Sequence, residues 1–160
     1  MPKKLLAFLL IFVSLSACAF AWISDEGKIS FSEPQGWKAE KDWNGVVFHG
    51  RPSYSGTITV NWKQCQDAEF TDELANQIID FQKKLFENMG KKVLGARTVT
   101  VNGVLMVKFT VEDPDTQHMT TIYSAVHNYI NYTFTLSSDK SAYSSVIPAL
   151  DNMVKSAKFL

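Results

Sequence analysis

The chain has 160 residues, enough for one domain with a hydrophobic core and too few for two ordinary domains. Hydrophobic residues make up 46% of the sequence and charged residues 20%, which is typical of a globular protein and argues against a disordered one. The formal net charge is zero. This balance argues against a nucleic-acid partner, because nucleic-acid-binding proteins carry a basic stripe or patch.

Residues 1–23 are predicted to be a targeting segment. Lys3 and Lys4 precede an apolar run that is too short by itself to span a bilayer, as in a signal peptide. The sequence Leu15-Ser16-Ala17-Cys18 follows and resembles a bacterial lipobox, in which the cysteine thiol carries a diacylglycerol. We therefore expect a lipoprotein signal peptide at residues 1–17, acylation with palmitate at Cys18, and a lipidated tether at residues 18–28.

Two other interpretations of this segment stay open. The sequence Ala19-Phe20-Ala21 fits the small-x-small rule for ordinary cleavage, which would release a soluble secreted protein after Ala21. The uncharged run from Leu5 to Ile23 is also just long enough for an uncleaved membrane anchor. We favour the lipoprotein, which would lie in the cell envelope on the periplasmic or other extracytoplasmic side of a membrane.

Short strands are predicted for the first part of the mature chain. Ile29 and Phe31 flank a serine, and a tight turn with the sequence Pro34-Gln35-Gly36-Trp37 follows. Residues 46–48 form a further short apolar run. Residues 57–62 alternate between polar and apolar side chains, which predicts a strand with one buried face.

Two amphipathic helices are predicted. The first has Thr71 as N-cap and Gly90 as the residue that ends it. Its apolar stripe, which we expect to lie on the sheet, steps by three or four residues through Leu74, Ile78, Phe81, Leu85 and Met89. Ala75, Ile79 and Phe86 widen this stripe. The second helix is predicted from about Asp139 to Lys155, with a bend or a late start caused by Pro148, since proline removes an internal hydrogen bond.

Between the helices, residues 93–137 are predicted to form an antiparallel meander. Polar and apolar residues alternate through this stretch, and Asn102-Gly103 is a strong signal for a two-residue hairpin turn. The order is therefore strands, helix, four-strand meander and helix. It indicates a single α+β domain at residues 29–160, with an antiparallel sheet on which a long central helix and a C-terminal helix pack.

This order of elements resembles the PsbP-like superfamily, and two short motifs support the resemblance. They are the turn at residues 34–37 and the closing sequence Lys155-Ser156-Ala157-Lys158-Phe159. A lipobox ahead of such a domain resembles the DcrB-type bacterial lipoproteins of that superfamily. The resemblance implies an envelope lipoprotein with an accessory or binding role, and it implies no catalytic residues.

The sequence contains no recognised catalytic, phosphate-binding or zinc-binding motif. His118 and His127 lie nine residues apart on one predicted strand, and odd spacing places them on opposite faces. A metal site that pairs His49 with another histidine, or a cation site at the Asp113–Asp115 turn, is therefore less favoured than solvated side chains. We predict no catalytic residues, no cofactor and no metal site.

Aromatic residues in the N-terminal loops are the main candidates for binding. If Trp43 and Tyr54 are exposed on neighbouring loops, they would form a binding surface. The alternative, which we favour, is that the aromatic residues close the open edge of the core.

Two classes of function remain. One is a non-enzymatic accessory or binding protein, held at a membrane by its lipid anchor and having an envelope protein as partner. The other is an envelope enzyme with a histidine and carboxylate site in a cleft between the sheet and the helices. We favour the binding protein, because no set of residues combines a nucleophile, a base and an orienting group.

Overall fold

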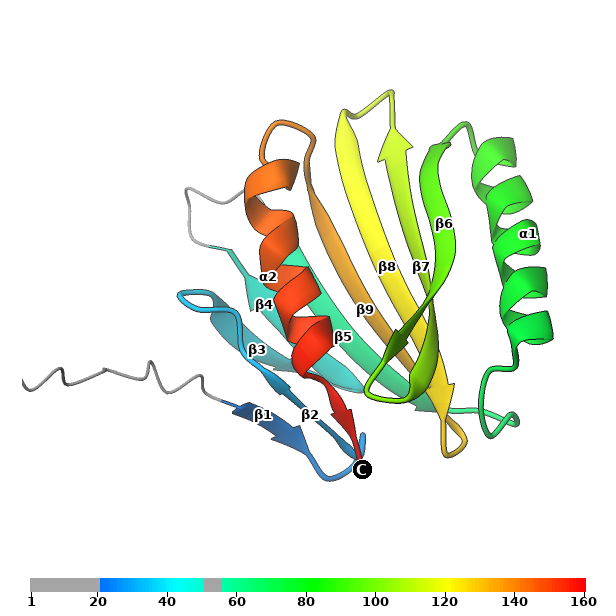
Figure 1. The fold of residues 1–160 in the computed structure, drawn as a ribbon. Helices are drawn as coiled ribbons and strands as arrows, with labels where there is room; N and C mark the ends of the chain where they lie inside the picture. The colour runs from blue at the N-terminus through cyan, green and yellow to red at the C-terminus, as the bar shows by residue number, and fades with distance from the viewer. Residues whose placement is uncertain (1–20, 51–55) are drawn as a thin grey trace, which may run out of the picture.

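The computed structural model describes residues 21–50 and 56–160, which form two antiparallel sheets and two helices (Figure 1). The large sheet has seven strands, in the spatial order β3 (Lys38–Asp42), β4 (Gly45–His49), β5 (Gly56–Gln64), β9 (Ile130–Asp139), β8 (His118–His127), β7 (Val104–Asp113) and β6 (Lys92–Val101). The small sheet consists of β1 (Ala21–Ser24), β2 (Ile29–Ser32) and β10 (Lys158–Phe159). The helices are α1 (Asp72–Asn88) and α2 (Tyr143–Ser156), and the predicted α+β class is confirmed.

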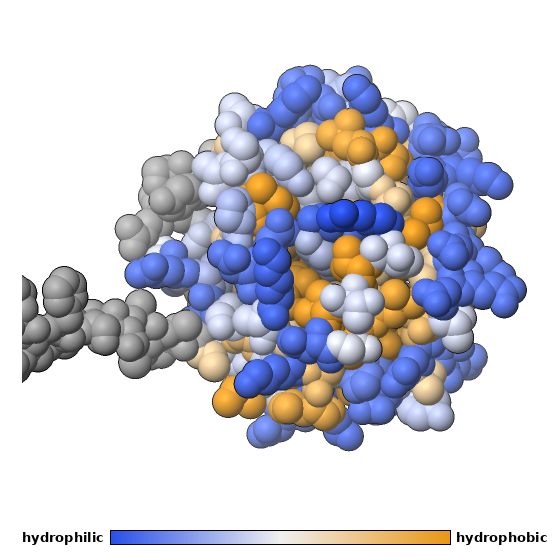
Figure 2. All heavy atoms as spheres, in the orientation of Figure 1, coloured by the Kyte–Doolittle hydropathy of each residue, from blue (hydrophilic) through white to orange (hydrophobic). Residues whose placement is uncertain are grey.

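The two helices pack on opposite faces of the large sheet. Neighbouring residues of β8 show this, because Tyr123 belongs to the hydrophobic cluster under α2 and Ile122 to the cluster under α1. The cluster under α2 is the larger and also contains residues of the small sheet, such as Phe31. In Figure 1, α2 crosses in front of the large sheet and α1 lies beside β6. On the side that carries α2, apolar surface gathers next to hydrophilic side chains (Figure 2).

Local signals in the sequence correctly predicted several boundaries. The Thr71 side chain accepts a hydrogen bond from the backbone N–H of Leu74 at 3.2 Å and so caps α1. Gly90 ends the helix with a φ of 73°. Asn102 and Gly103 have φ values of 49° and 85°, and they join Val101 to its partner Val104 in a two-residue hairpin turn.

The domain begins earlier than the sequence suggested. Residues 21–24 form β1, which pairs with β2, so the tether expected at residues 18–28 extends too far into the chain. Trp22 packs edge-to-face on Phe48, with ring centroids 6.1 Å apart. The Ser24 hydroxyl accepts a hydrogen bond from the backbone N–H of Gly27 at 2.9 Å. The turn is also tied to the rest of the fold, because the Tyr132 hydroxyl donates to the Gly27 carbonyl at 2.8 Å and the Leu160 N–H to the Lys28 carbonyl at 2.7 Å. The polar run at residues 24–28 is therefore a structured turn and not a free tether.

The C-terminal helix starts later than the predicted Asp139, but it does not start at Pro148. Asp139 is the last residue of β9 and not the start of a helix, because its strand continues the ladder with β8. Helix α2 begins at Tyr143 and contains Pro148 in its second turn. As the sixth residue of α2, Pro148 lies beyond the first four N–H groups, so it removes one internal hydrogen bond, the one to the Ser144 carbonyl.

A polar cluster joins α2 to the sheet beneath it. Asp151 of α2 accepts a hydrogen bond from the Tyr123 hydroxyl at 2.6 Å and one from the Lys108 ammonium at 3.1 Å. The same ammonium lies 4.7 Å from the centroid of the Tyr123 ring. Burial, together with the nearby Asp151 carboxylate, raises the pKa of Tyr123, so its hydroxyl stays protonated and remains a donor.

Candidate functional site

Of the two aromatic residues predicted to form a binding surface, the structure describes Trp43 and not Tyr54. Trp43 is 87% exposed at the turn between β3 and β4, where its backbone N–H donates to the Asp42 carboxylate at 2.7 Å. Tyr54 lies outside the described residues, as does Cys18. A binding surface that combines Trp43 with Tyr54 therefore stays a prediction.

Each histidine faces a carboxylate and not another histidine. His49 lies 3.3 Å from Glu40, His127 lies 3.3 Å from Glu69, and His118 lies 3.4 Å from Asp139. His118 and His127 occupy opposite faces of β8, as their spacing predicted, and His49 is three strands away from His118, or about 14 Å. Within residues 21–50 and 56–160, no three potential ligands gather around one point.

Helix α1 carries more apolar surface than the sheet covers. The residues that it buries are Ala75 and Ile79, and Phe86 packs edge-to-face on Phe109 with ring centroids 6.0 Å apart. The side chains on the adjacent flank remain in solvent, with exposed fractions of 65%, 40% and 59% for Phe81, Leu85 and Met89. We call these three residues the apolar flank of α1.

The exposed flank corrects the expectation that these three residues lie on the sheet. The stripe that meets the sheet is one residue further along the helix, at positions 75, 79 and 86. A signal was present, because the apolar residues of this helix cover a wider arc than one stripe needs. Periodicity alone does not say which part of a wide arc is covered, since every stripe within it has the same spacing.

Beside α1, part of the large sheet presents a polar face that neither helix covers. α1 packs over β6 and β7, whereas strands β5, β9 and β8 extend beyond it. Many of their side chains on this side carry a hydroxyl or an amide, and we call the following set the hydroxyl face: Thr57, Thr59, Asn61, Thr120, Ser124, Thr133, Thr135 and Ser137. The same side of these strands also carries Lys63, His118, Ile122, Val126, Asn131 and Asp139. The register places them in rows, with Thr57 opposite Ser137 and Thr59 opposite Thr135.

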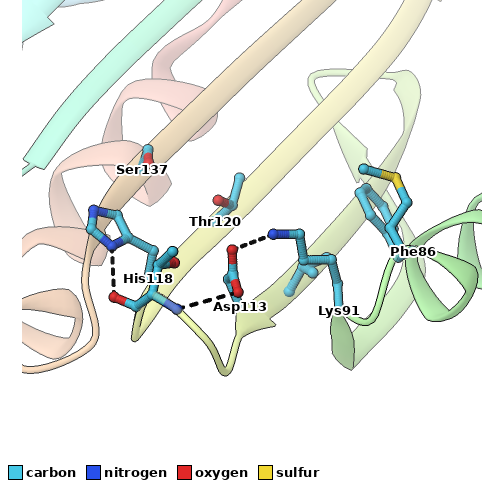
Figure 3. A pocket seen from close by; sticks show the side chains of 9 residues that line it. Phe86, Lys91, Asp113, His118, Thr120 and Ser137 are labelled. Atoms are coloured by element: carbon cyan, nitrogen blue, oxygen red, sulfur yellow. Dashed lines mark hydrogen bonds and ion pairs between the residues drawn. The ribbon is translucent and has the colours of Figure 1, made fainter.

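A cavity of about 380 Å³ lies where the end of α1 meets the hydroxyl face (Figure 3). Its apolar wall consists of Phe86, Met89 and Val111. Its polar residues are Lys91, Asp113, Thr116, His118, Thr120 and Ser137. Figure 3 shows Phe86 at one side of this cavity and His118 with Ser137 at the other. Met89 belongs to both the cavity and the apolar flank, and we call the cavity together with this flank the α1 groove.

A serine, a histidine and an aspartate, the residue types of a catalytic triad, lie at the α1 groove, but they lack the hydrogen bonds of a triad. Ser137 and Asp139 lie on β9, and His118 lies on the neighbouring strand β8. The His118 ring places Nδ1 3.1 Å from the Thr116 carbonyl and Nε2 3.4 Å from the Asp139 carboxylate. Both ring nitrogens thus face other oxygens, and no hydrogen bond joins Ser137 to this ring in the part of the chain that the structure describes. A serine nucleophile needs such a bond to its base.

An ion pair of Lys91 with Asp113 stands at the centre of the groove (Figure 3). The other oxygen of Asp113 accepts hydrogen bonds from the backbone N–H groups of Asp115 at 3.1 Å and Thr116 at 3.4 Å. The bond from Lys91, followed by those from the turn, lowers the pKa of Asp113 from 3.8 to about 2. Asp113 is therefore an ionised anchor for the turn, and it would be a poor proton donor.

The Asp113→Asn variant is expected to be less stable than the wild type at neutral pH and equally stable in strong acid. Because the folded-state pKa is lowered to about 2, the ionised carboxylate stabilises the fold above about pH 4, and this contribution is lost as the pH falls towards 2. Thermal unfolding of both proteins between about pH 2 and pH 7 measures it. A difference in Tm that stays constant across this range would contradict the ion pair.

The sheet with one helix on each face, together with a groove that lacks a catalytic arrangement, defines a PsbP-like α+β domain. The PsbP family model matches residues 20–159, and the chain therefore belongs to the PsbP family. A comparison with curated proteins finds no match. Within residues 21–50 and 56–160, no helix has both the length and the apolar character needed to cross a membrane.

Solved structures of low sequence identity share this fold. The cyanobacterial PsbP (CyanoP) of Synechocystis sp. PCC 6803 is 13% identical, with a TM-score of 0.67 over 88% of this chain and 92% of the other. The yeast Ran-binding protein Mog1p of Saccharomyces cerevisiae is 15% identical, with a TM-score of 0.55 over 88% and 94%. PA94 of Pseudomonas aeruginosa, described as a protein of unknown function and putative regulator, is 13% identical, with a TM-score of 0.57 over 85% and 93%.

Proposed function

We propose that this protein is a bacterial envelope lipoprotein of the DcrB type that acts as a non-enzymatic binding or accessory protein. The observation that carries the binding role is the α1 groove. A row of large apolar side chains stands in solvent there, next to a sheet face rich in hydroxyl groups. A partner that covers the apolar flank would gain about 1.5–3 kcal/mol for each large side chain that it buries completely.

The groove fits a protein segment better than a substrate undergoing reaction. Its hydroxyl groups can donate hydrogen bonds to, and accept them from, uncharged groups of a partner. Its apolar wall adds hydrophobic contact, which does not depend on direction. Its charged groups are already paired within the fold, as Lys91 with Asp113 and His118 with Asp139. The description of Mog1p as Ran-binding provides a precedent for a protein partner on this fold.

The location follows from the lipobox-like sequence. Cys18 precedes the first residue of β1, Ala21, by three residues, which span at most about 11 Å. A lipid on Cys18 would therefore hold the folded domain close to the membrane surface. Stable anchoring requires more than one acyl chain, which a diacylglycerol provides.

Replacing two residues of the apolar flank tests the binding role. The double variant Phe81→Ser/Met89→Ser is expected to fold normally, because both side chains are already exposed, and to lose an envelope partner that co-purifies stoichiometrically with the wild type. Asn76→Ser, on the other flank of the same helix, is the matched control and should retain it. Equal recovery of the partner with all three proteins would contradict binding in the groove.

Acyl labelling tests the lipid anchor. Wild-type protein expressed in bacteria is expected to incorporate labelled palmitate, and Cys18→Ser is expected to incorporate none, because the serine hydroxyl cannot take the place of the thiol. An unlabelled wild type whose mature chain begins at Trp22 would instead establish the secreted form. Label that persists in Cys18→Ser would contradict attachment at this residue.

A further inference from the structure

The two edge strands of the large sheet, β3 and β6, differ in how well they are protected against pairing with a strand of another chain. Strand β3 at one edge has five residues, of which Lys38, Glu40, Lys41 and Asp42 are charged. Charges and short length are the usual means by which an edge avoids pairing with another chain. Strand β6 at the other edge has ten residues, and its segment from Thr98 to Val101 is uncharged and alternates threonine with valine. This segment favours strand pairing.

The hairpin turn determines which backbone groups of β6 point outward. In a two-residue hairpin the flanking pair, Val101 and Val104, exchanges hydrogen bonds, and bonded pairs then alternate along the ladder. The intervening residues Ala96, Thr98 and Thr100 therefore direct their N–H and C=O groups away from β7. Among the described residues, none forms a hydrogen bond with these outward groups. The bulge between Val93 and Gly95 and the hairpin turn limit this segment at its two ends.

The helix above the edge is placed so that a second copy would fit beside it. Met89 lines the groove over Thr120 and Ser137, so the apolar flank points towards the hydroxyl face. The opposite flank, which points towards the β6 edge, carries Asn76, Asp80, Lys83 and Glu87. α1 packs over Val107 and Phe109 of β7 as well as Ala96 of β6, so it does not block the edge.

One contact shows which residues of α1 lie beside which residues of β6. Phe86 packs on Phe109, and Phe109 is the register partner of Ala96. Thr98 lies two residues further along β6, about 7 Å, which corresponds to about four to five residues back along α1. The point of the helix level with Thr98 therefore lies between Asp80 and Lys83.

From these positions we propose that the protein forms a homodimer in which the β6 strands of two copies pair antiparallel about a twofold axis at Thr98. The two large sheets then become one continuous sheet, with about six new backbone hydrogen bonds from Ala96, Thr98 and Thr100. Thr98 lies opposite the partner's Thr98, a favourable cross-strand pair. On the helices, Asp80 lies across from the partner's Lys83, and Lys83 from the partner's Asp80.

The register also limits repulsion at the new edge. Arg97 is the charged residue of the segment from Ala96 to Val101, and it lies opposite the partner's Val99 and not opposite the partner's Arg97. Twofold symmetry makes this interface closed, so that pairing ends at two copies. The short, charged β3 strands remain at the outer edges of the dimer, where they oppose further growth.

Cysteine cross-linking in cells tests the proposed register. In the full chain with Cys65→Ser, Thr98→Cys is expected to form a disulfide-linked dimer on mild oxidation, because Cα atoms of a hydrogen-bonded pair lie about 5.5 Å apart. Ala39→Cys on the β3 edge is the matched control and should remain monomeric. Equal cross-linking of the two variants, or none at Thr98→Cys, would overturn the proposal.

Backbone and charge variants test the same dimer in solution by light scattering. Thr98→Pro removes an outward N–H that the β6–β7 ladder does not use, so the fold is retained, and the dimer dissociation constant should rise at least about tenfold. Thr98→Val keeps this N–H and should remain dimeric. Lys83→Glu should weaken the dimer, and adding Asp80→Lys should restore it. A monomeric wild type, or a dimer that survives Thr98→Pro, would overturn the proposal.

Discussion

Replacing Phe134 with alanine is expected to lower the free energy of unfolding by about 3–5 kcal/mol. Phe134 is fully buried in β9, with Val60 and Tyr123 as its register partners on either side, and its ring packs edge-to-face on Phe31 at 5.9 Å. Phe31 belongs to the small sheet, so the cavity would open where both sheets and α2 meet. Close packing on all sides allows little collapse into that cavity.

Urea unfolding followed by circular dichroism measures this effect, and the adjacent residue provides the control. Thr135 follows Phe134 on β9 but points to the hydroxyl face, so Thr135→Ala should change the free energy of unfolding by less than about 1 kcal/mol. Similar losses for Phe134→Ala and Thr135→Ala would mean that the side facing α2 is not the main core.

Replacing Asp151 with alanine is expected to cost about 2–3 kcal/mol of folding free energy. Its carboxylate accepts hydrogen bonds from the Tyr123 hydroxyl and the Lys108 ammonium, and Tyr123 is buried. Removing the acceptor leaves both donors without a partner beneath α2. An unsatisfied buried donor costs more than the hydrogen bond contributed, because it remains shielded from water.

Two variants distinguish the loss of this polar cluster from a general weakening of α2. Asp151→Asn keeps an oxygen acceptor for the Tyr123 hydroxyl and should cost less than Asp151→Ala. Asn152→Ala, at the next and exposed position, should cost little. A double-mutant cycle of Asp151→Ala with Lys108→Met, measured by chemical unfolding, should give a coupling of at least about 0.5 kcal/mol. A loss for Asp151→Ala no larger than that for Asn152→Ala would contradict the cluster's role.

The candidate site shows where inference from sequence stops. His118 and His127 were expected to be poor co-ligands, and a site that pairs His49 with one of them was less favoured. In the structure each of the three histidines lies next to its own carboxylate. Trp43 is exposed, and its pairing with Tyr54 stays a prediction because Tyr54 lies outside the described residues. The α1 groove was missed because its polar half consists of ordinary solvent-facing strand residues. Its apolar half had been assigned to the core.

The amino-acid sequence by itself determined the local elements of this protein. Period-two alternation in residues 98–111, the Asn102-Gly103 turn, and the Thr71 and Gly90 helix ends act over a few residues, and the backbone geometry that defines them is local. Tertiary structure alone decided which stripe of α1 is buried and which sheet face stays open. Burial depends on how α1, α2 and the small sheet cover the large sheet. α1 packs mainly over β6 and β7, which leaves Phe81, Leu85 and Met89 in solvent beside the hydroxyl face.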